Sequence, residues 1–283
     1  MAQRFFTLAL ITTVFVSLIM ALPAVAEPAQ RGGVVKERSS PDLTGVPGPH
    51  PDLTGVWHAT GRNYGDLSAM VVKGQEIVLT HYGADRYRKV DQGIGDPGAL
   101  CLPWGPIRGM IIPHPFAILQ NPSVIAVLIE SQRTYRPIYM DGRGHPADLK
   151  EHPEWMGHSI GKWEGDTLVV DTVGVDTRAW LDTSGFEHSD KLHITERYQK
   201  TGPDTIKWDV TFEDPVFFAK PFTAEWIFNR SIGDRIISHS CVEFEHDVKD
   251  MVPGILIGGS GKAKEEGGSE VVTPQNRPGG PRP

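Results

Sequence analysis

Short stretches in which apolar and polar residues alternate dominate the chain. Residues 206–212 place Ile, Trp, Val and Phe at every second position, and residues 222–228 repeat this with Phe, Ala, Trp and Phe. Alternation with a period of two is typical of a strand that buries one face. Further strands are expected at 56–57, 77–80, 124–130, 135–140, 159–163, 168–170, 190–199 and 235–244, and one helix is expected at 247–257.

This pattern predicts an all-β fold. Short strands at close spacing, with turn residues between most of them, indicate a sandwich or a closed barrel. An antiparallel β-barrel of the lipocalin-like or calycin-like kind removes its own edges and has room for one small ligand. Residues 91–114 interrupt the pattern, because they are rich in glycine and proline. Long loops of this kind often form lids or binding loops.

The N-terminus has the three parts of a secretory signal peptide. Arg4 supplies a positive charge, residues 5–22 form an uncharged and mostly apolar run, and Ala24-Val25-Ala26 is a small-residue cleavage site. A retained membrane anchor is the alternative, because the apolar run approaches the length that spans a bilayer. We expect cleavage, which predicts a periplasmic or secreted protein with no membrane insertion of the mature chain.

Composition predicts the domain boundaries. Residues 27–51 read as a flexible linker and residues 258–283 as a disordered Gly/Pro tail, since both are poor in residues that a core could bury. A single β-rich domain is therefore expected over residues 52–257.

The cysteines suggest a disulfide, and the negative net charge limits the classes of partner that the protein could bind. In an exported chain, Cys101 and Cys241 suggest one disulfide, with two free buried thiols as the alternative. The net charge of −7 and the pI near 5.9 argue against nucleic acid or anionic lipid as the main partner, because both require a concentrated basic face. A small molecule is the expected partner.

The stretch Gly157-His158-Ser159-Ile160-Gly161 matches the nucleophile elbow of α/β-hydrolases. That elbow requires a strand before the serine and a helix after it. Neither is expected around Ser159, so we disfavour a serine hydrolase.

Eleven histidines raise the question of a metal site. His188 and His193, joined by His158, could supply ligands, but histidines on a loop and a strand lack the helical spacing of zinc signatures. Ordinary hydrogen-bonded histidines are the favoured interpretation, and no metal is predicted.

Polar residues gather between residues 130 and 145. Arg136, Tyr139, Asp141 and Arg143 could orient a carboxylate or phenolate, with Trp155 as a further binding residue. A solvated hairpin with cross-strand ion pairs is the alternative. Glu196 shares its strand parity with Leu192 and Ile194, so it is expected to point inward. A carboxylate there either has a partner or acquires a raised pKa, which is typical of an acid/base residue.

Several motifs together resemble a known family. They are Asp52-Leu-Thr-Gly-Val-Trp57, Cys101-Leu-Pro-Trp-Gly105, residues 139–143, 155–171, 180–182 and 188–198, and Glu213-Asp-Pro215. With these motifs the chain resembles a family of exported, functionally uncharacterised proteins common in environmental bacteria. The resemblance implies that Cys101 pairs with Cys241 and brings no activity with it. The chain departs from the family pattern after Cys241, where it has Val-Glu-Phe in place of the expected His-Glu-Gly.

These observations predict an exported enzyme that acts on a small, partly apolar and aromatic molecule by acid–base chemistry, as a lyase, isomerase or hydrolase. No dinucleotide fingerprint, phosphate loop or haem site is present in the sequence, so no organic cofactor is expected. His158, His188, His193 and Glu196 are the candidates for proton transfer. A periplasmic carrier without catalysis is the main alternative, and an envelope interaction module is a third.

Overall fold

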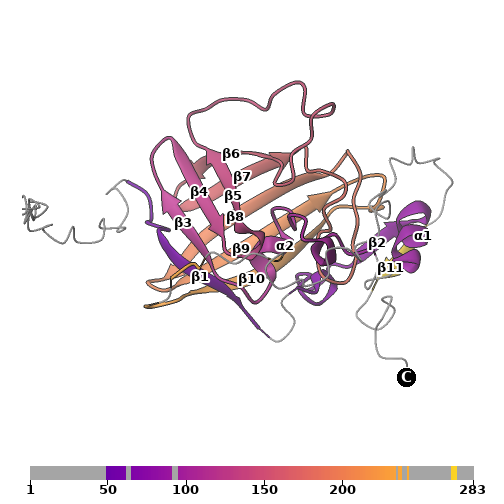
Figure 1. Cartoon of the computed structure of the whole chain (residues 1–283), viewed down its shortest axis with the longest axis horizontal. Helices are drawn as coiled ribbons and strands as arrows, with labels where there is room; N and C mark the ends of the chain where they lie inside the picture. The colour runs from indigo at the N-terminus through magenta and orange to yellow at the C-terminus, as the bar shows by residue number, and fades with distance from the viewer. Residues whose placement is uncertain are drawn as a thin grey trace, which may run out of the picture. The chain divides into compact units, whose positions relative to one another are not determined.

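A closed barrel of nine strands is the centre of the fold (Figure 1). The computed structural model describes residues 49–61, 65–90, 95–233, 235–237, 241 and 269–272. Around the barrel the strand order is β1-β10-β9-β8-β7-β6-β5-β4-β3, and β1 closes the ring by pairing with both β10 and β3. The barrel strands are β1 (Gly55–Thr60), β3 (Phe116–Gln120), β4 (Val124–Ile129), β5 (Thr134–Tyr139), β6 (His158–Glu164), β7 (Thr167–Val173), β8 (His193–Gly202), β9 (Thr205–Glu213) and β10 (Phe222–Arg230).

The all-β barrel predicted from the alternation is confirmed, and the sandwich alternative is excluded by the closed ring. One pair departs from the expected antiparallel order, because β5 and β6 run parallel, with Ile138 opposite Ser159. Parallel neighbours cannot be joined by a tight hairpin and require a long crossover. Residues 140–157 form that crossover.

The lumen of the barrel is filled by its own side chains. Trp208 and Trp226 from neighbouring strands have ring centroids 5.3 Å apart, and Phe228 lies 5.1 Å from Trp208. The short helix α2 (Arg108–Ile111) brings Met110 inside, where its sulfur lies 3.9 Å from the Tyr198 hydroxyl. The expected room for a ligand inside the barrel is therefore taken up by large aromatic residues and by α2.

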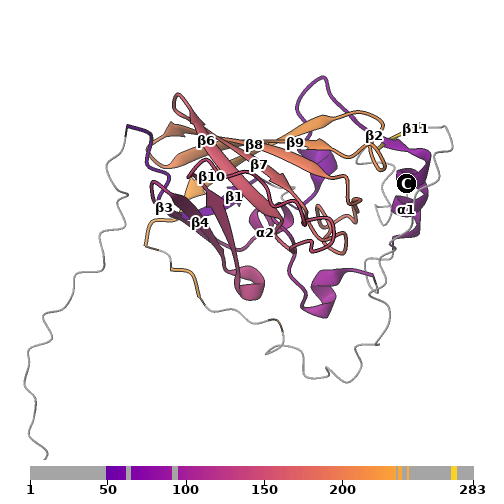
Figure 2. The same cartoon turned by 90° about the horizontal axis from the view of Figure 1, so that it is seen from above.

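A smaller two-stranded sheet lies beside helix α1 (His81–Lys89). It pairs β2 (Ile77–Thr80) with β11 (Ser269–Val272), where Val271 is opposite Val78. Helix α1 was not expected from the sequence, although Thr80 caps it by accepting a hydrogen bond from the Gly83 amide at 3.0 Å. The four residues of β11 fall in the segment expected to be a disordered tail, and β2 is their partner (Figure 2).

The other sequence expectations have mixed outcomes. The strands at 56–57, 77–80, 124–130, 135–140, 159–163, 168–170, 190–199, 206–212 and 222–228 are confirmed within a few residues, and β3 was missed. Of the strand expected at 235–244, the described residues 235–237 and 241 are not in a strand, and the others lie outside the described residues. The expected helix at 247–257, the signal peptide and most of the linker lie outside the described residues. Among the helices that the structure describes, none is long and apolar enough to cross a membrane.

The segment 91–114 is more ordered than expected over its described part, residues 95–114. It contains the 3-10 helix η2 (Pro97–Leu100) as well as α2, and Arg108 is buried in a two-pronged ion pair with Asp96 at 2.6 and 2.7 Å. The predicted disulfide between Cys101 and Cys241 is confirmed, with Cα atoms 5.4 Å apart. It joins this segment to a residue 140 positions further along the chain.

Candidate functional site

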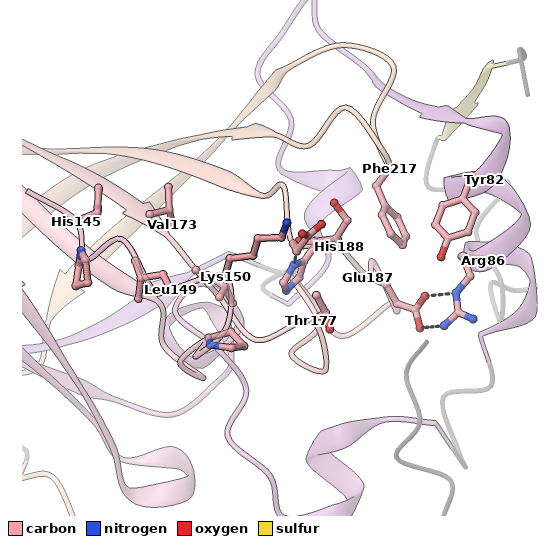
Figure 3. A pocket seen from close by; sticks show the side chains of 16 residues that line it. Tyr82, Arg86, His145, Leu149, Lys150, Val173, Thr177, Glu187, His188 and Phe217 are labelled. Atoms are coloured by element: carbon pink, nitrogen blue, oxygen red, sulfur yellow. Dashed lines mark hydrogen bonds and ion pairs between the residues drawn. The ribbon is translucent and has the colours of Figure 1, made fainter. Parts of the chain in front are cut away.

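A pocket of about 530 Å³ lies at one end of the barrel, outside the lumen (Figure 3). The end of β7, the start of β8 and the end of β9 meet there because these strands are antiparallel neighbours. The pocket runs from His145 and Val173 at the barrel wall, past His188, to Tyr82 and Arg86 on α1. Its volume lies in the range of about 300–1,000 Å³ that is typical of small-molecule sites.

Apolar and polar side chains share the wall of the pocket. Leu149, Val173, Val175 and Phe217 provide apolar surface, whereas charged and hydrogen-bonding groups come mainly from α1 and from the segment before β8. The polar lining residues include Tyr82, Arg86, His145, Lys150, Thr177, Glu187, His188, Ser189 and Asp190. A site of this composition suits a molecule with both an apolar body and polar groups.

His188 is the buried titratable group of this pocket, with 3% of its surface exposed. Its Nδ1 lies 3.0 Å from the Ser189 carbonyl oxygen, and a carbonyl can only accept, so Nδ1 carries the proton. Nε2 therefore presents a lone pair, and it has no hydrogen-bond partner in the described part of the chain. Burial lowers the pKa of His188, although the Ser189 carbonyl and the carboxylates of Asp214 and Asp176 oppose this shift.

Asp214 holds the two segments that flank His188 and Phe217. Its buried carboxylate accepts hydrogen bonds from the Ser189 amide at 2.6 Å and from the Ser189 hydroxyl at 2.8 Å. It also accepts from the Val216 amide at 3.0 Å. One carboxylate thus fixes the turn before β8 and the turn after β9, and with them two walls of the pocket.

Helix α1 closes the far side of the pocket. Arg86 donates two hydrogen bonds of 2.7 Å to Glu187, which fastens the helix to the residue preceding His188. Tyr82 packs edge-on against Phe217, with ring centroids 5.3 Å apart. Gly83 permits this close approach, because a Cβ there would lie 2.3 Å from the Phe217 carbonyl oxygen.

A second cluster lies on the outer face of the barrel next to the pocket. Nδ1 of His145, from the crossover, lies 2.9 Å from Nδ1 of His158 on β6. Nε2 of His145 lies 3.2 Å from Asp171 on β7, and Nε2 of His193 on β8 lies 3.0 Å from the same carboxylate oxygen. His145 also lines the pocket, so it connects this cluster to the site.

Glu196 points into the lumen, as its strand parity predicted. It forms a buried ion pair with Arg136, one of whose contacts is 3.0 Å long, and accepts a hydrogen bond of 2.7 Å from the Tyr198 hydroxyl. The Trp208 indole donates to it at 3.2 Å. Ser159 lies in the same network and accepts a hydrogen bond from Arg136 at 3.0 Å. Because Ser159 is fully buried inside the barrel, it is not the exposed serine of a nucleophile elbow.

The remaining predicted residues lie around the outer cluster or apart from it. Tyr139 stacks on His158 with ring centroids 5.2 Å apart, and the Arg143 guanidinium lies 4.0 Å above the Tyr139 ring. Asp141 pairs with Arg143 at the surface. Trp155 lies under the guanidinium of Arg178 at 4.4 Å. The structure thus divides the predicted site residues among the lumen, the outer face and the pocket.

The predicted histidines do not converge on a metal site within the described part of the chain. Among the described residues, no group of three or more His, Cys, Asp or Glu side chains is arranged to hold a metal ion. His158 and His193 belong to the outer cluster, whereas His188 lies in the pocket.

Sequence reasoning missed several pocket residues. Arg86, Glu187 and Phe217 come from segments that carry no alternation, and Lys150 lies in the crossover. Two signals were present in the chain. The N-cap Thr80 and the basic last turn of α1 mark a helix, and Asp214 before Pro215 marks a turn.

Comparisons with known proteins assign no family. No protein-family model and no curated protein matches the sequence. Among solved structures, the chain is similar to a secretary abundant heat soluble (SAHS) protein from Ramazzottius varieornatus, with 13% identity, 63% of this chain and 95% of that chain covered, and a TM-score of 0.24. A TM-score this low does not establish a shared fold, and the barrel described above follows from the strand pairing alone.

Proposed function

We propose that this protein binds a small, partly apolar molecule in the pocket at the end of the barrel. The observation that carries the proposal is the buried Nε2 of His188, which has no partner among the described residues although its ring lines the pocket. A buried acceptor without a hydrogen bond costs about 1–3 kcal/mol. A ligand that donates a hydrogen bond to this nitrogen would recover that free energy.

The lining defines the chemistry of the expected ligand. Because His188 Nε2 accepts, the ligand carries a donor, such as the hydroxyl of a phenol. Phe217, Leu149 and Val175 favour an aromatic or other apolar body. Arg86 is neutralised by Glu187. Lys150 is therefore the lysine or arginine of the lining that forms no ion pair with a described residue, so a ligand with an acidic group is favoured.

Binding can be tested with anilinonaphthalene sulfonate, an aromatic anion with an N–H donor whose fluorescence rises in apolar sites. Thr177 lines the pocket, so Thr177→Trp should fill it and weaken binding about tenfold or more. The matched control is Thr167→Trp, at the opposite end of β7, which should bind the dye like the parent protein. Equal affinity of parent protein and Thr177→Trp would contradict the proposal.

The hydrogen bond can be tested separately with para-nitrophenol. His188→Gln should weaken binding of this phenol, whereas His81→Gln, on an exposed position of α1, should not. If both variants bind the phenol like the parent protein, His188 does not contact the ligand.

Acid–base catalysis is the second candidate, and His188 favours it. A neutral imidazole whose tautomer is fixed by a backbone carbonyl can accept a proton from a bound substrate, and the nearby carboxylates of Asp214 and Asp176 stabilise the resulting imidazolium. Any lyase, isomerase or hydrolase activity found by substrate screening should fall about 10²–10⁴-fold in His188→Gln. An activity that survives this change would reduce the role of His188 to binding.

We also propose that the protein is exported and belongs to the family of environmental-bacterial proteins whose motifs it resembles. The disulfide between Cys101 and Cys241 supports export, because such bonds persist in oxidising compartments. N-terminal sequencing of the protein recovered from the periplasm or medium should begin at Glu27. Recovery of the full chain from the cytoplasm would contradict export.

A further inference from the structure

The crossover between β5 and β6 forms one wall of the pocket. Pro146, Leu149, Lys150 and Pro153 from this crossover line it. We refer to residues 141–153 as the cover segment. Leu149 is its buried anchor, and Glu154, immediately after it, is fastened to the barrel by a backbone hydrogen bond of 2.9 Å to Gly174. Most of the segment between these anchors and β5 is exposed.

His145 fastens the N-terminal half of the cover segment. Its two ring nitrogens contact His158 and Asp171 on the outer face of the barrel. Among the described residues of the cover segment, it is the one whose side chain hydrogen-bonds to the barrel. The side chains of Asp141 and Arg143 instead pair with each other. Loss of the His145 contacts would therefore leave about eight residues held by Leu149 and the end of β5.

The proton positions in this cluster follow from hydrogen-bond rules. The Asp171 carboxylate can only accept, so Nε2 of both His145 and His193 donates to it. A neutral His145 then presents a lone pair at Nδ1, and His158 donates its Nδ1 proton to that lone pair across 2.9 Å. Every contact of the cluster is satisfied when both rings are neutral.

The number of protons on the two rings decides whether the contact between His145 and His158 holds. An extra proton on His158 goes to its Nε2 and leaves the gap between the two Nδ1 atoms unchanged. An extra proton on His145 goes to its Nδ1, and the contact is kept when His158 moves its own proton to Nε2 and accepts at Nδ1. Protonation of both His145 and His158 places two N–H groups and two positive charges in that gap, which removes the hydrogen bond and adds repulsion.

Charged groups face both rings of the clasp. Arg143, stacked above Tyr139, opposes a positive charge on His158, and Asp141 pairs with Arg143. His145 and His193 on β8 contact the same Asp171 carboxylate. Glu213 on β9 is opposite His193 in the strand register. Burial, His145 and Arg143 all lower the pKa of His158, so its protonation comes only on acidification.

We propose that His145 and His158 form an acid-sensitive clasp, which holds the cover segment against the barrel and releases it when both rings are protonated. Release would loosen the part of the pocket wall that His145 and Pro146 form and so weaken ligand binding. This second step rests on the proposed binding function, whereas the first step concerns the chain alone.

Backbone ¹⁵N relaxation of the full chain tests the clasp without a ligand. The order parameters of residues 141–148 should fall from about 0.85, typical of a rigid backbone, at about pH 7.5 to below about 0.6 at about pH 5. His158→Asn should abolish the acid response, because the asparagine amide can both donate and accept at the same place without titrating. His145→Ala should show low order parameters over residues 141–148 at both pH values. The matched control His58→Asn, whose histidine contacts Ser231 elsewhere, should respond like the parent protein.

The dye titration then separates the two steps. The affinity of the parent protein for anilinonaphthalene sulfonate should fall on acidification more than that of His158→Asn, and both proteins retain His188. Order parameters in the parent protein that do not change with pH, or an equal acid response in His158→Asn, would overturn the clasp whatever the dye does. If the order parameters behave as expected but dye binding is insensitive to Thr177→Trp, the clasp stands and the proposed binding site fails.

Discussion

The Arg136 guanidinium and the Glu196 carboxylate form an ion pair inside the barrel, and neither side chain has any exposed surface. Thr172, Tyr198 and Trp208 complete the hydrogen bonds of the pair. Breaking a buried pair from one side leaves an uncompensated charge, which costs far more than the pair itself contributes. Glu196 therefore belongs to the packed lumen and does not line the pocket.

Glu196→Gln should lower the free energy of unfolding by about 3–5 kcal/mol, because Arg136 would remain charged and buried. Urea denaturation measures this loss. Glu164→Gln is the control, since Glu164 pairs with Lys162 and Arg197 at the surface and its replacement should change stability by less than about 1 kcal/mol. Equal losses in the two variants would show that the lumen pair carries no special cost.

Replacement of Cys101 and Cys241 by serine together should lower the free energy of unfolding by about 2–5 kcal/mol. The bond closes a loop of 140 residues, and chain-entropy models assign larger effects to longer loops. Denaturation midpoints of the parent protein with and without reductant should show the same difference. An unchanged midpoint on reduction would contradict this role.

Asp214→Asn should loosen both turns that frame the pocket. The amide would lose charge-assisted hydrogen bonds from the amides of Ser189 and Val216, which predicts a stability loss of about 1–3 kcal/mol and weaker dye binding. Asp204→Asn is the control, because Asp204 pairs with Arg230 at the surface. Parent-like dye affinity in Asp214→Asn would show that the pocket does not depend on this carboxylate.

Gly83→Ala should push α1 away from Phe217. The added Cβ would meet the Phe217 carbonyl at 2.3 Å, and backbone on both sides leaves little room to adjust. Overpacking of this kind costs about 1–3 kcal/mol, and the shift should alter dye affinity. Gly144→Ala is the matched control, because an added Cβ there meets no atom within 4 Å. Thermal and urea unfolding of the two variants would distinguish them.

Acid should destabilise the fold through His188. Burial lowers its pKa in the folded state, so the unfolded chain binds a proton more readily. Its contribution to stability is complete above the ordinary histidine pKa of about 6.5 and is lost as the pH falls from there through the lowered value. His188→Gln should remove part of the decline in urea midpoint between about pH 7.5 and 5. An identical pH profile in the variant would contradict this.

The sequence alone determined the barrel strands except β3, and it determined which of their side chains point inward. Alternation fixed the inward faces of β9 and β10 because a strand places successive side chains on opposite sides. The same parity carried Glu196 inward. Because the chain has two cysteines, one intramolecular disulfide is possible. These properties depend on local geometry or on the number of cysteines, so a single sequence is sufficient to predict them.

Only the tertiary structure decided what the inward and outward residues meet. Strand parity does not specify which strands are neighbours, so it could not show that Arg136 would neutralise Glu196 from β5. The parallel pairing of β5 and β6 forces a long crossover, which brings His145 to His158 and places Leu149 in the pocket wall. Closure of the ring also fills the lumen with three tryptophans and moves the candidate binding site to the end of the barrel, because volume inside a nine-stranded ring is limited by the side chains that its own strands direct inward.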